Sequence, residues 1–407
     1  QVAPPLSECL ARVSKRPRID MVCVSVQRAA VGAAQQQREK GRGKPRARPN
    51  AGRALRASSG VGEAATSSAA SQSRRLGKSD LVVAPIGIGA WSWGETLYWN
   101  DGWGAEKEAL ARGAYNAYLE ACGEDAWIDT AEVYGGLLGG ESERIIGRFM
   151  RDSVSTDGGT GQPQGRPKVA SKFAAIPWRV TKDSVVDACR ASTARMKTGT
   201  CDLYQLHWPG LWQNDAYLEG LAETVKQGLV KAVGVSNYNE KRLQQAHDRL
   251  RDMGVPLASN QVHYNLLYRL PEQNGVLEKC RELGVTVVAY SPVAQGMLTG
   301  KYTETNLPSG ARQQMGYNAD FCRKAAPLLD LMRIVGENHG GKTPSQVALN
   351  WLLTNPDVTV IPGVKNREQV EELMGALGWQ LSEAEVEELR KAAKAVPPVQ
   401  GFPAEKF

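Results

Sequence analysis

The stretch "AWIDTAEVYGG", residues 126–136, places a short apolar run directly before three ionisable side chains. The run through Ile128 has the composition of a buried strand, and Asp129, Glu132 and Tyr134 follow within six positions. Carboxylates are costly to bury inside a strand without partners. We therefore interpret this stretch as a strand whose carboxyl end carries functional polar side chains.

Seven other runs rich in Val, Ile and aromatic residues share this character. Together the eight predicted strands cover residues 81–91, 126–131, 167–173, 202–208, 229–237, 257–265, 285–292 and 358–364. The segments between them carry apolar residues at helical spacing, such as Leu243, Ala246 and Leu250. Residues 343–346 ("TPSQ") and 382–385 ("SEAE") have the pattern of helix-start capping boxes.

Strands that are apolar on both faces, each followed by a helix, predict a parallel sheet covered by helices. Eight such units in succession favour an α/β fold of the (β/α)8 TIM barrel type. A doubly wound open sheet is the alternative. The chain has no GxGxxG motif, which makes that alternative less favoured.

The first 75 residues differ in composition from the rest of the chain. They hold 15 Lys/Arg against 4 Asp/Glu, whereas the remaining residues hold 35 against 39. Such a polar, basic segment cannot bury enough apolar surface to fold, so we predict a disordered leader over residues 1–75. An Arg- and Ser-rich, acid-poor leader is typical of organelle transit peptides, and Met21 is a candidate initiator. A nonspecific basic arm is the alternative.

The domain prediction is therefore a leader (1–75), one barrel (76–395) and a C-terminal tail (396–407) that packs near the barrel. The mildly acidic body argues against nucleic-acid binding, and no apolar run is long enough for a membrane span. The seven cysteines show no metal-ligand spacing. We expect free thiols, no metal, and a soluble monomer.

Polar residues gather where the predicted strands end, which in a barrel is a single rim. The rim set is Asp129, Tyr134, Lys172, His207, Ser236, Asn237, Asn260, Gln261, Tyr290 and Ser291. Each has a plainer explanation when taken alone, such as a packing aromatic, a snorkelling lysine or a turn residue. Their shared rim favours a catalytic site.

At these residues the chain resembles the aldo-keto reductase family. The matching segments are "DTAEVYG", "ASKF", "LYQLHWPG", "AVGVSNY", "ASNQVHYN", "AYSPVAQGMLTGKY" and "IPGVKNREQ", in the family's order over about residues 80–395. Residues 87–104, together with "FAAIPWR" and "DLYQLHWPGLW", resemble the plastid-targeted plant and algal members. This resemblance implies a chloroplast location in the stroma, with association with plastid lipid bodies left open.

The resemblance implies a catalytic tetrad of Asp129, Tyr134, Lys172 and His207. Reduction of a carbonyl needs a hydride at carbon and a proton at oxygen, and Tyr134 would donate that proton. A cation beside a phenol lowers its pKa, so we expect Lys172, held by Asp129, to lower that of Tyr134. His207 would bind the substrate carbonyl, and Glu132 is expected to bond the loop rather than a ligand.

The cofactor implied by the resemblance is NADPH/NADP. Tyr290 would stack on the nicotinamide, Ser236, Asn237 and Gln261 would hold its carboxamide, and Lys365 and Arg367 would bind the 2′-phosphate at a helix start. The remaining residues in the predicted cofactor set are Gly89, Ala90, Trp91, Ser291, Pro292, Gln295, Gly296, Leu298, Gly300, Lys301, Gly363, Gln369 and Glu372. Leu373 departs from the family, many of whose members have Asn there.

The substrate prediction is a small-molecule carbonyl compound contacted by Trp93, Trp178 and Trp208. The favoured function is NADPH-dependent reduction of aldehydes or ketones to alcohols. Two alternatives stay open: an NADPH-binding redox-sensing or regulatory barrel with slow turnover, and a Schiff-base lyase using Lys172.

Overall fold

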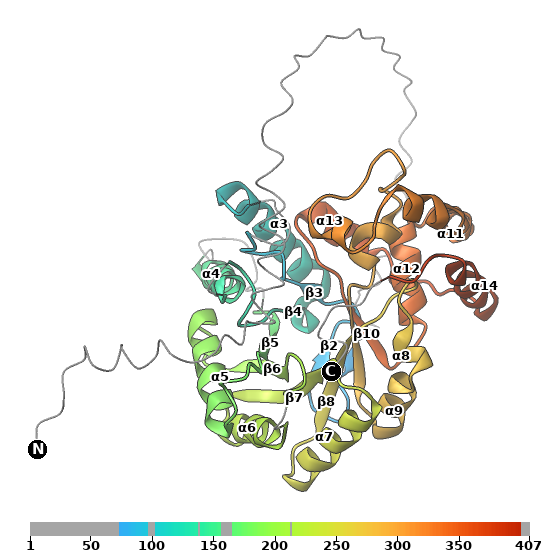
Figure 1. Ribbon diagram of the computed structural model, residues 1–407. Coiled ribbons are helices and arrows are strands. Elements are labelled where there is room, and N and C mark those ends of the chain that lie inside the picture. The colour runs from blue at the N-terminus through green and yellow to red at the C-terminus, as the bar shows by residue number, and fades with distance from the viewer. Residues whose placement is uncertain (1–72, 97–101, 137–138, 156–164, 212–213, 400–407) are drawn as a thin grey trace, which may run out of the picture. The chain divides into compact units, whose positions relative to one another are not determined.

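The computed structural model describes residues 73–96, 102–136, 139–155, 165–211 and 214–399. Eight parallel strands form one sheet in the order β10-β9-β8-β7-β6-β5-β4-β3 (Figure 1). Their bounds are β3 Ile88–Gly89, β4 Trp127–Asp129, β5 Lys168–Phe173, β6 Cys201–Leu206, β7 Val230–Ser236, β8 Leu257–His263, β9 Thr286–Tyr290 and β10 Val358–Ile361. The predicted α/β barrel is confirmed.

The barrel closes between its first and last strands. Parallel bridges join Ile86 to Val360 and Gly89 to Gly363, and the Gly89 amide donates to the Pro362 carbonyl (2.9 Å). Among the described residues, these bridges join β3 and β10, the two end strands of the sheet. Closure also brings all eight carboxyl ends to one rim, as the sequence predicts.

The first predicted strand, residues 81–91, is wrong as a single element. Val82–Val83 (β2) pairs with Arg74–Arg75 (β1) in a separate antiparallel hairpin, and only Ile88–Gly89 enters the barrel as a strand. Pro85 lies between the two pieces and has no amide hydrogen for a ladder. The Arg74 guanidinium donates to the carbonyls of Leu353, Asn355 and Val358, which ties the hairpin to the segment that enters β10.

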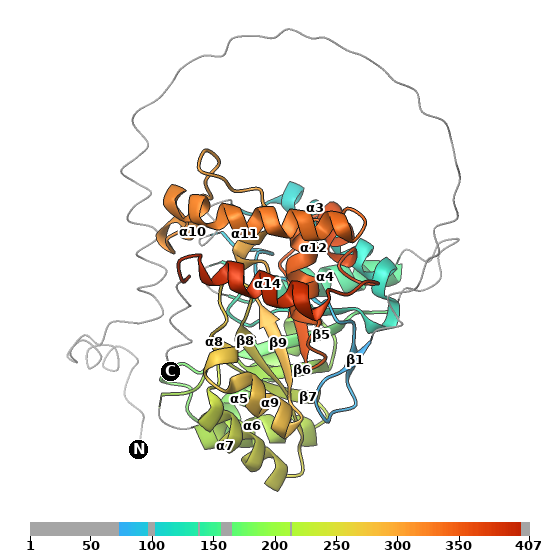
Figure 2. The same cartoon turned by 90° about the vertical axis from the view of Figure 1, so that its right-hand side faces the viewer.

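Helices follow the strands around the barrel (Figure 1). Their bounds are α3 Ala105–Cys122, η2 Gly123–Asp125, α4 Glu141–Ser155, α5 Lys182–Met196, α6 Asn214–Lys226, α7 Glu240–Asp252, α8 Leu270–Gln273, α9 Val276–Leu283, η3 Ala294–Thr299, α10 Ala311–Gln314, α11 Ala319–Asn338, α12 Pro344–Leu353, α13 Arg367–Met374 and α14 Glu383–Lys394. Helices α11 and α14 lie side by side (Figure 2).

Local sequence signals explain where these helices begin and which face they bury. The capping boxes predicted at Thr343 and Ser382 are both formed, at the starts of α12 and α14. Leu243, Ala246 and Leu250 are fully buried on α7, so the predicted helical period is confirmed. A helix that buries one stripe against the strands holds the barrel wall in place.

The two ends of the chain are described only in part. Most of the predicted leader, residues 1–72, and the end of the tail, residues 400–407, lie outside the described residues, while Val396 and Val399 are buried. The predicted boundary at residue 75 is wrong, because Arg74 and Arg75 form β1. The five cysteines of the described chain are free and buried. No described helix is long and apolar enough to cross a membrane.

Candidate active site

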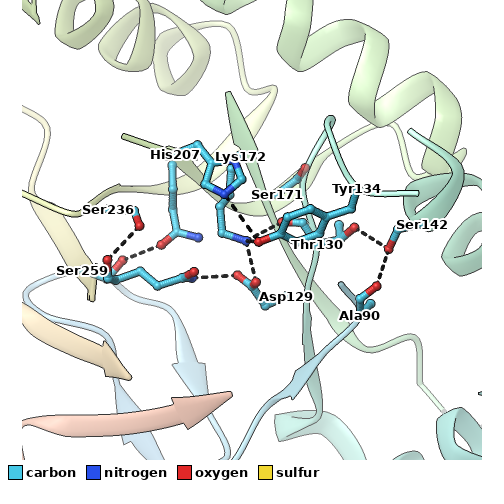
Figure 3. Close-up of polar contacts among 12 residues, drawn as sticks. Ala90, Asp129, Thr130, Tyr134, Ser142, Ser171, Lys172, His207, Ser236 and Ser259 are labelled. Atoms are coloured by element: carbon cyan, nitrogen blue, oxygen red, sulfur yellow. Dashed lines mark hydrogen bonds and ion pairs between the residues drawn. The ribbon is translucent and has the colours of Figure 1, made fainter. Parts of the chain in front are cut away.

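Three neighbouring strands supply the predicted tetrad. Asp129 ends β4, Lys172 lies one residue before the end of β5, and His207 directly follows β6. Tyr134 lies in the loop that follows β4, which turns back over the strand end (Figure 3). The structure brings all four side chains together, as the sequence predicts.

The contacts among these four residues are short and continuous. Lys172 Nζ donates to Asp129 Oδ1 (2.5 Å) and to the Thr130 carbonyl (2.7 Å), and it lies 3.3 Å from Tyr134 Oη. Tyr134 Oη lies 3.4 Å from His207 Nε2. The phenol therefore stands between an ammonium group and an imidazole, with a carboxylate beneath (Figure 3).

Charge and burial oppose each other in this cluster. Burial disfavours the charge on Lys172, but Asp129 and Tyr134 outweigh it and leave the lysine pKa raised, so the ammonium form persists. For Tyr134, burial raises the pKa, and the nearby Lys172 only partly offsets this effect. The expected lowering of the Tyr134 pKa is wrong, because desolvation of the phenolate is the larger effect.

His207 is neutral in this setting. Burial, reinforced by the Lys172 charge, lowers its pKa well below the usual value. Its Nδ1 is buried without a hydrogen-bond partner among the described residues, whereas Nε2 faces Tyr134. A proton on Nε2 avoids an unpaired buried N–H, so the tautomer that donates into the site is favoured.

Glu132 bonds the loop, as expected. Its Oε1 accepts hydrogen bonds from the Ala174 amide (2.6 Å) and Arg179 (2.7 Å), and Oε2 accepts a third from Arg179 (3.2 Å). The guanidinium also lies over the Phe173 ring. These contacts fasten the loop after β4, which carries Tyr134, to the loop after β5. Arg179 lies in no distinctive motif, so its role could not be predicted from the sequence.

The predicted carboxamide residues already have partners. Ser236 Oγ donates to the Gln261 carbonyl (2.7 Å). Asn237 has a left-handed φ of 61°, accepts from Tyr290 Oη (3.0 Å) and donates to the His207 carbonyl (3.2 Å). Gln261 Nε2 donates to Asp129 Oδ2 (2.8 Å). The predicted nicotinamide-binding residues and the tetrad are thus connected directly.

Tyr290 is the outer member of an aromatic stack that sequence reasoning missed. The rings of Tyr290 and His263 are parallel with centroids 5.3 Å apart, and His263 stacks on Tyr268 at 4.1 Å. Tyr290 is partly exposed while His263 is buried. The stack holds the Tyr290 ring in a fixed plane, as a shelf for a flat ligand requires.

The loop after β9 has an unusual backbone. Ser291, Ala294 and Gln295 have left-handed φ values of 52°, 48° and 54°, and Gly296 follows at 95°. Such conformations are costly for residues other than glycine and mark functional loops, and turns of this kind direct amide groups toward an anion. Lys301 is exposed nearby, while Pro292 and Leu298 are buried and would contribute backbone only.

At the start of α13 the residues predicted to bind the phosphate make hydrogen bonds within the protein. Arg367 donates to both carboxylate oxygens of Glu120 on α3 (3.1 and 3.0 Å) and to Glu371 (3.3 Å). Lys365 is exposed, and its amide donates to Gln369 Oε1 (2.7 Å). Glu372 Oε1 accepts from Thr343 (3.0 Å). A phosphate near α13 would therefore compete with Glu120 and Glu371 for the Arg367 guanidinium.

The residues near the first strand serve mainly structural roles. Gly89 and Ala90 are buried. The Ala90 amide donates to the backbone carbonyl of Asp129 (2.8 Å), and the Ala90 carbonyl accepts from Ser142 Oγ (2.9 Å) (Figure 3). The Trp91 ring lies 6.2 Å from that of Tyr134, which places it beside the tetrad. Gly363 is exposed and bridges Gly89.

The three tryptophans predicted to bind substrate differ in their surroundings. Trp93 is fully buried, packs on Phe149 and donates to the Val364 carbonyl (2.9 Å), so its side chain has no exposed surface for a substrate to contact. Trp208 is partly exposed, with its ring 4.6 Å from His207. Trp178 is 74% exposed. Trp208 adjoins the tetrad, and Trp178 lies on the loop fastened by Glu132.

Comparison with known proteins identifies the class. The aldo/keto reductase family model matches residues 85–394. The chain is 40% identical over 322 residues to the chloroplastic pyridoxal reductase of Arabidopsis thaliana, covering 78% of this chain and 85% of that protein. A thermostable aldo-keto reductase crystallised with the inhibitor epalrestat superposes with a TM-score of 0.61 at 28% identity, covering 79% of this chain and 99% of the other.

A second solved structure is that of an aldo/keto reductase from Klebsiella pneumoniae in complex with NADP and acetate. It matches with a TM-score of 0.58 at 27% identity, covering 81% of this chain and 97% of the other. The chain therefore belongs to the aldo/keto reductase family and is an oxidoreductase.

Proposed function

We propose that this protein reduces aldehydes or ketones to alcohols with NADPH, and that Tyr134 donates the proton. The observation that carries the proposal is the position of Tyr134 Oη, 3.3 Å from Lys172 Nζ and 3.4 Å from His207 Nε2. A carbonyl oxygen that accepts from both Tyr134 and His207 is held where a proton can reach it. We therefore expect the protein to reduce a carbonyl substrate that binds at this position.

The reaction follows from what each side chain supplies. NADPH, when bound, supplies the hydride. His207 Nε2–H orients the substrate oxygen, and Tyr134 transfers its proton to that oxygen as negative charge develops there. Lys172 then stabilises the phenolate left behind, while Asp129 keeps the ammonium in place. Neutral His207 and protonated Tyr134 are the forms that reduction needs.

The cofactor is NADP(H), and several features of the chain fit it. Tyr290 presents a partly exposed ring backed by His263, and the left-handed turns at Ala294–Gly296 suit a pyrophosphate. The start of α13 offers backbone amides and the cation Lys365 to a phosphate. These observations support a nicotinamide near Tyr134 and a phosphate near α13.

For the substrate we propose a flat aromatic aldehyde, with pyridoxal as the first candidate. The relative from Arabidopsis thaliana bears the name pyridoxal reductase. In this chain Trp91 and Trp208 lie beside Tyr134 and His207, so aromatic surface adjoins the point where the carbonyl would bind. Aromatic rings stack favourably on such surfaces.

The test is a carbonyl panel that contains pyridoxal and lipid-derived aldehydes, assayed by NADPH oxidation. We expect Tyr134→Phe to lower kcat about 10²- to 10⁴-fold with nearly unchanged NADPH affinity, measured by quenching of protein fluorescence. Unchanged turnover in Tyr134→Phe would remove the proton-donor role. NADPH binding without turnover of any carbonyl in the wild type would instead support the redox-sensing alternative.

We also propose that residues 1–75 direct the protein to the plastid stroma. The basic, acid-poor composition of this segment and the chloroplastic relative support the proposal. Fluorescent fusions with and without residues 1–72 test it, because this deletion keeps Arg74 and Arg75 of β1. Only the full fusion should accumulate in plastids. Labelling confined to plastid lipid droplets would place the protein on lipid bodies instead.

A further inference from the structure

One hydrogen bond of the site crosses the interior of the barrel. Gln261 Nε2 on β8 donates to Asp129 Oδ2 on β4 at 2.8 Å. In the closed order of eight strands, three strands separate β4 from β8 on either side. The bond therefore joins opposite walls of the barrel directly beneath the tetrad.

This bond determines how Asp129 can act on its partners. The Asp129 side chain is almost fully buried, with Oδ1 bound to Lys172 and Oδ2 bound to Gln261. A buried carboxylate needs a donor for each oxygen. Because Gln261 satisfies Oδ2, only Oδ1 faces Lys172, and the ammonium is free to direct another proton at Tyr134.

The orientation of the Gln261 amide has a second consequence. A primary amide carries its oxygen and nitrogen on opposite sides of one planar group. With Nε2 fixed on Asp129, the oxygen is the part of the amide that can accept from another donor. The same side chain would then bind a nicotinamide carboxamide through Oε1 and Asp129 through Nε2.

We propose that Gln261 is a positioning residue that sets the donor strength of Tyr134 through Asp129 and Lys172, and so couples nicotinamide binding to proton transfer. This inference rests on the proposed function. The titratable groups facing the pair are Lys172 from β5, Tyr134 from the loop after β4 and His207 from the end of β6.

Loss of the Gln261 donor has a definite expected effect. Asp129 would turn both oxygens toward Lys172 and draw the ammonium away from Tyr134, whose contact with it is already the longer one at 3.3 Å against 2.5 Å. The phenolate would lose part of its stabilisation. In Gln261→Met we expect kcat for reduction to fall about tenfold at saturating NADPH.

Gln261→Glu gives the sharper test, because a carboxyl group can replace the amide in one protonation state only. When protonated, it donates to Asp129 Oδ2 and preserves the arrangement; when ionised, it repels Asp129. The neighbouring carboxylate raises the pKa of the introduced group toward neutrality. We expect near-normal kcat at about pH 5.5 and a fall of about tenfold by about pH 8, where the wild-type rate is flat.

The matched control is Ser259→Ala, two positions earlier on the same face of β8. Ser259 Oγ bonds Gln205 (3.4 Å) and not Asp129, so its loss should leave the pH profile of kcat unchanged. The assays use the full chain, saturating NADPH and the best substrate of the panel. NADPH binding, measured by fluorescence, confirms that each variant is folded.

The outcomes separate the explanations. A new pH dependence of kcat in Gln261→Glu supports the proposal, even if Gln261→Met does not fold. A pH-independent kcat in Gln261→Glu, with only a weaker affinity for NADPH, overturns it and leaves Gln261 as a cofactor ligand. Failure of the proposed function is a different result, because the wild type would then reduce no carbonyl in the panel.

Discussion

The tetrad and the start of α13 are the two ends of the proposed NADPH site, but they are built differently. Lys172 is fully buried and its nitrogen has three oxygen partners within 3.3 Å. Arg367 on α13 is about half exposed, and its partners are the exposed carboxylates of Glu120 and Glu371. One cation is fixed by the barrel interior, and the other is held by exchangeable surface pairs.

This difference indicates where a substitution should have a large effect and where it should have a small one. A buried ion pair cannot be broken without leaving an uncompensated charge, so substitution of Lys172 or Asp129 should be strongly destabilising. Exposed pairs contribute little and are weakened by salt. Substitutions near α13 should therefore adjust cofactor preference while leaving the chemical step intact.

The largest effect should come from Lys172→Met. This change removes the charge that, in the proposed mechanism, stabilises the phenolate, and it leaves Asp129 buried without its ion partner. We expect kcat to fall by about 10³-fold or more and the free energy of unfolding to fall by about 3–5 kcal/mol. Steady-state assays and urea denaturation measure the two effects.

A matched control for that variant is Lys231→Met. Lys231 pairs with Asp202 at 2.8 Å, but its side chain is 59% exposed. Activity should be unchanged, and stability should fall by about 1 kcal/mol or less because the Lys231 ammonium is exposed. The buried Asp202 carboxylate keeps Arg166 (3.4 Å) and the Val169 amide (2.9 Å) as partners. Equal destabilisation by both substitutions would contradict the distinction between buried and exposed cations.

The next largest effect is a dependence on pH that differs between the two directions of the reaction. The raised pKa of Tyr134 keeps the phenol protonated at neutral pH, and the lowered pKa of His207 keeps the imidazole neutral. Reduction needs the protonated phenol, whereas alcohol oxidation needs the phenolate. Since the raised pKa of Tyr134 lies above neutral pH, the phenolate fraction grows as the pH rises. The rate of alcohol oxidation should therefore rise about tenfold per pH unit.

This prediction is checked between pH 6 and pH 9 with saturating cofactor. The kcat for reduction should be nearly flat, with no break near the ordinary pKa of histidine at about 6.5. The kcat for oxidation should rise throughout. A bell-shaped reduction profile centred near neutrality would show that His207 or Tyr134 titrates in this range.

The outcomes at the two ends also show what the sequence can and cannot predict. Asp129, Lys172 and His207 could be placed because strand runs give their positions and a barrel brings strand ends together. Trp93 could not, because its burial depends on Phe149, which is 56 positions away in the sequence. The partner of Gln261 lies 132 positions away across the barrel, and no local pattern encodes such contacts.

The balance between charge and burial at Tyr134 could not be predicted from the sequence either. Lys172 beside Tyr134 predicts a lowered tyrosine pKa, but the structure adds the burial of the phenol, which has the larger effect. Burial of a given atom depends on all the loops around it. Residue types and strand positions therefore predict which groups meet. Predicting how strongly each group shifts a pKa requires the three-dimensional structure.

A moderate effect should follow when both cations near α13 are removed. In Lys365→Ala with Arg367→Ala we expect NADPH affinity to fall about tenfold, because charge-assisted bonds to a phosphate are lost, while NADH affinity changes little. Fluorescence titrations with both cofactors measure this ratio. Equal weakening for NADPH and NADH would show that the 2′-phosphate binds elsewhere.

The smallest effect should come from Glu120→Gln, which removes a carboxylate that would compete with the proposed phosphate for Arg367. Glu120 on α3 holds Arg367 through two contacts of 3.1 and 3.0 Å, and α3 packs against α13. Releasing Arg367 should tighten NADPH binding about two- to threefold without changing NADH binding or kcat. Glu371→Gln, which removes a single contact of 3.3 Å, should act in the same direction but more weakly. Both gains should vanish at high salt, which screens exposed charges, and a gain that persists there would mean that Glu120 acts through packing of α3 rather than through charge.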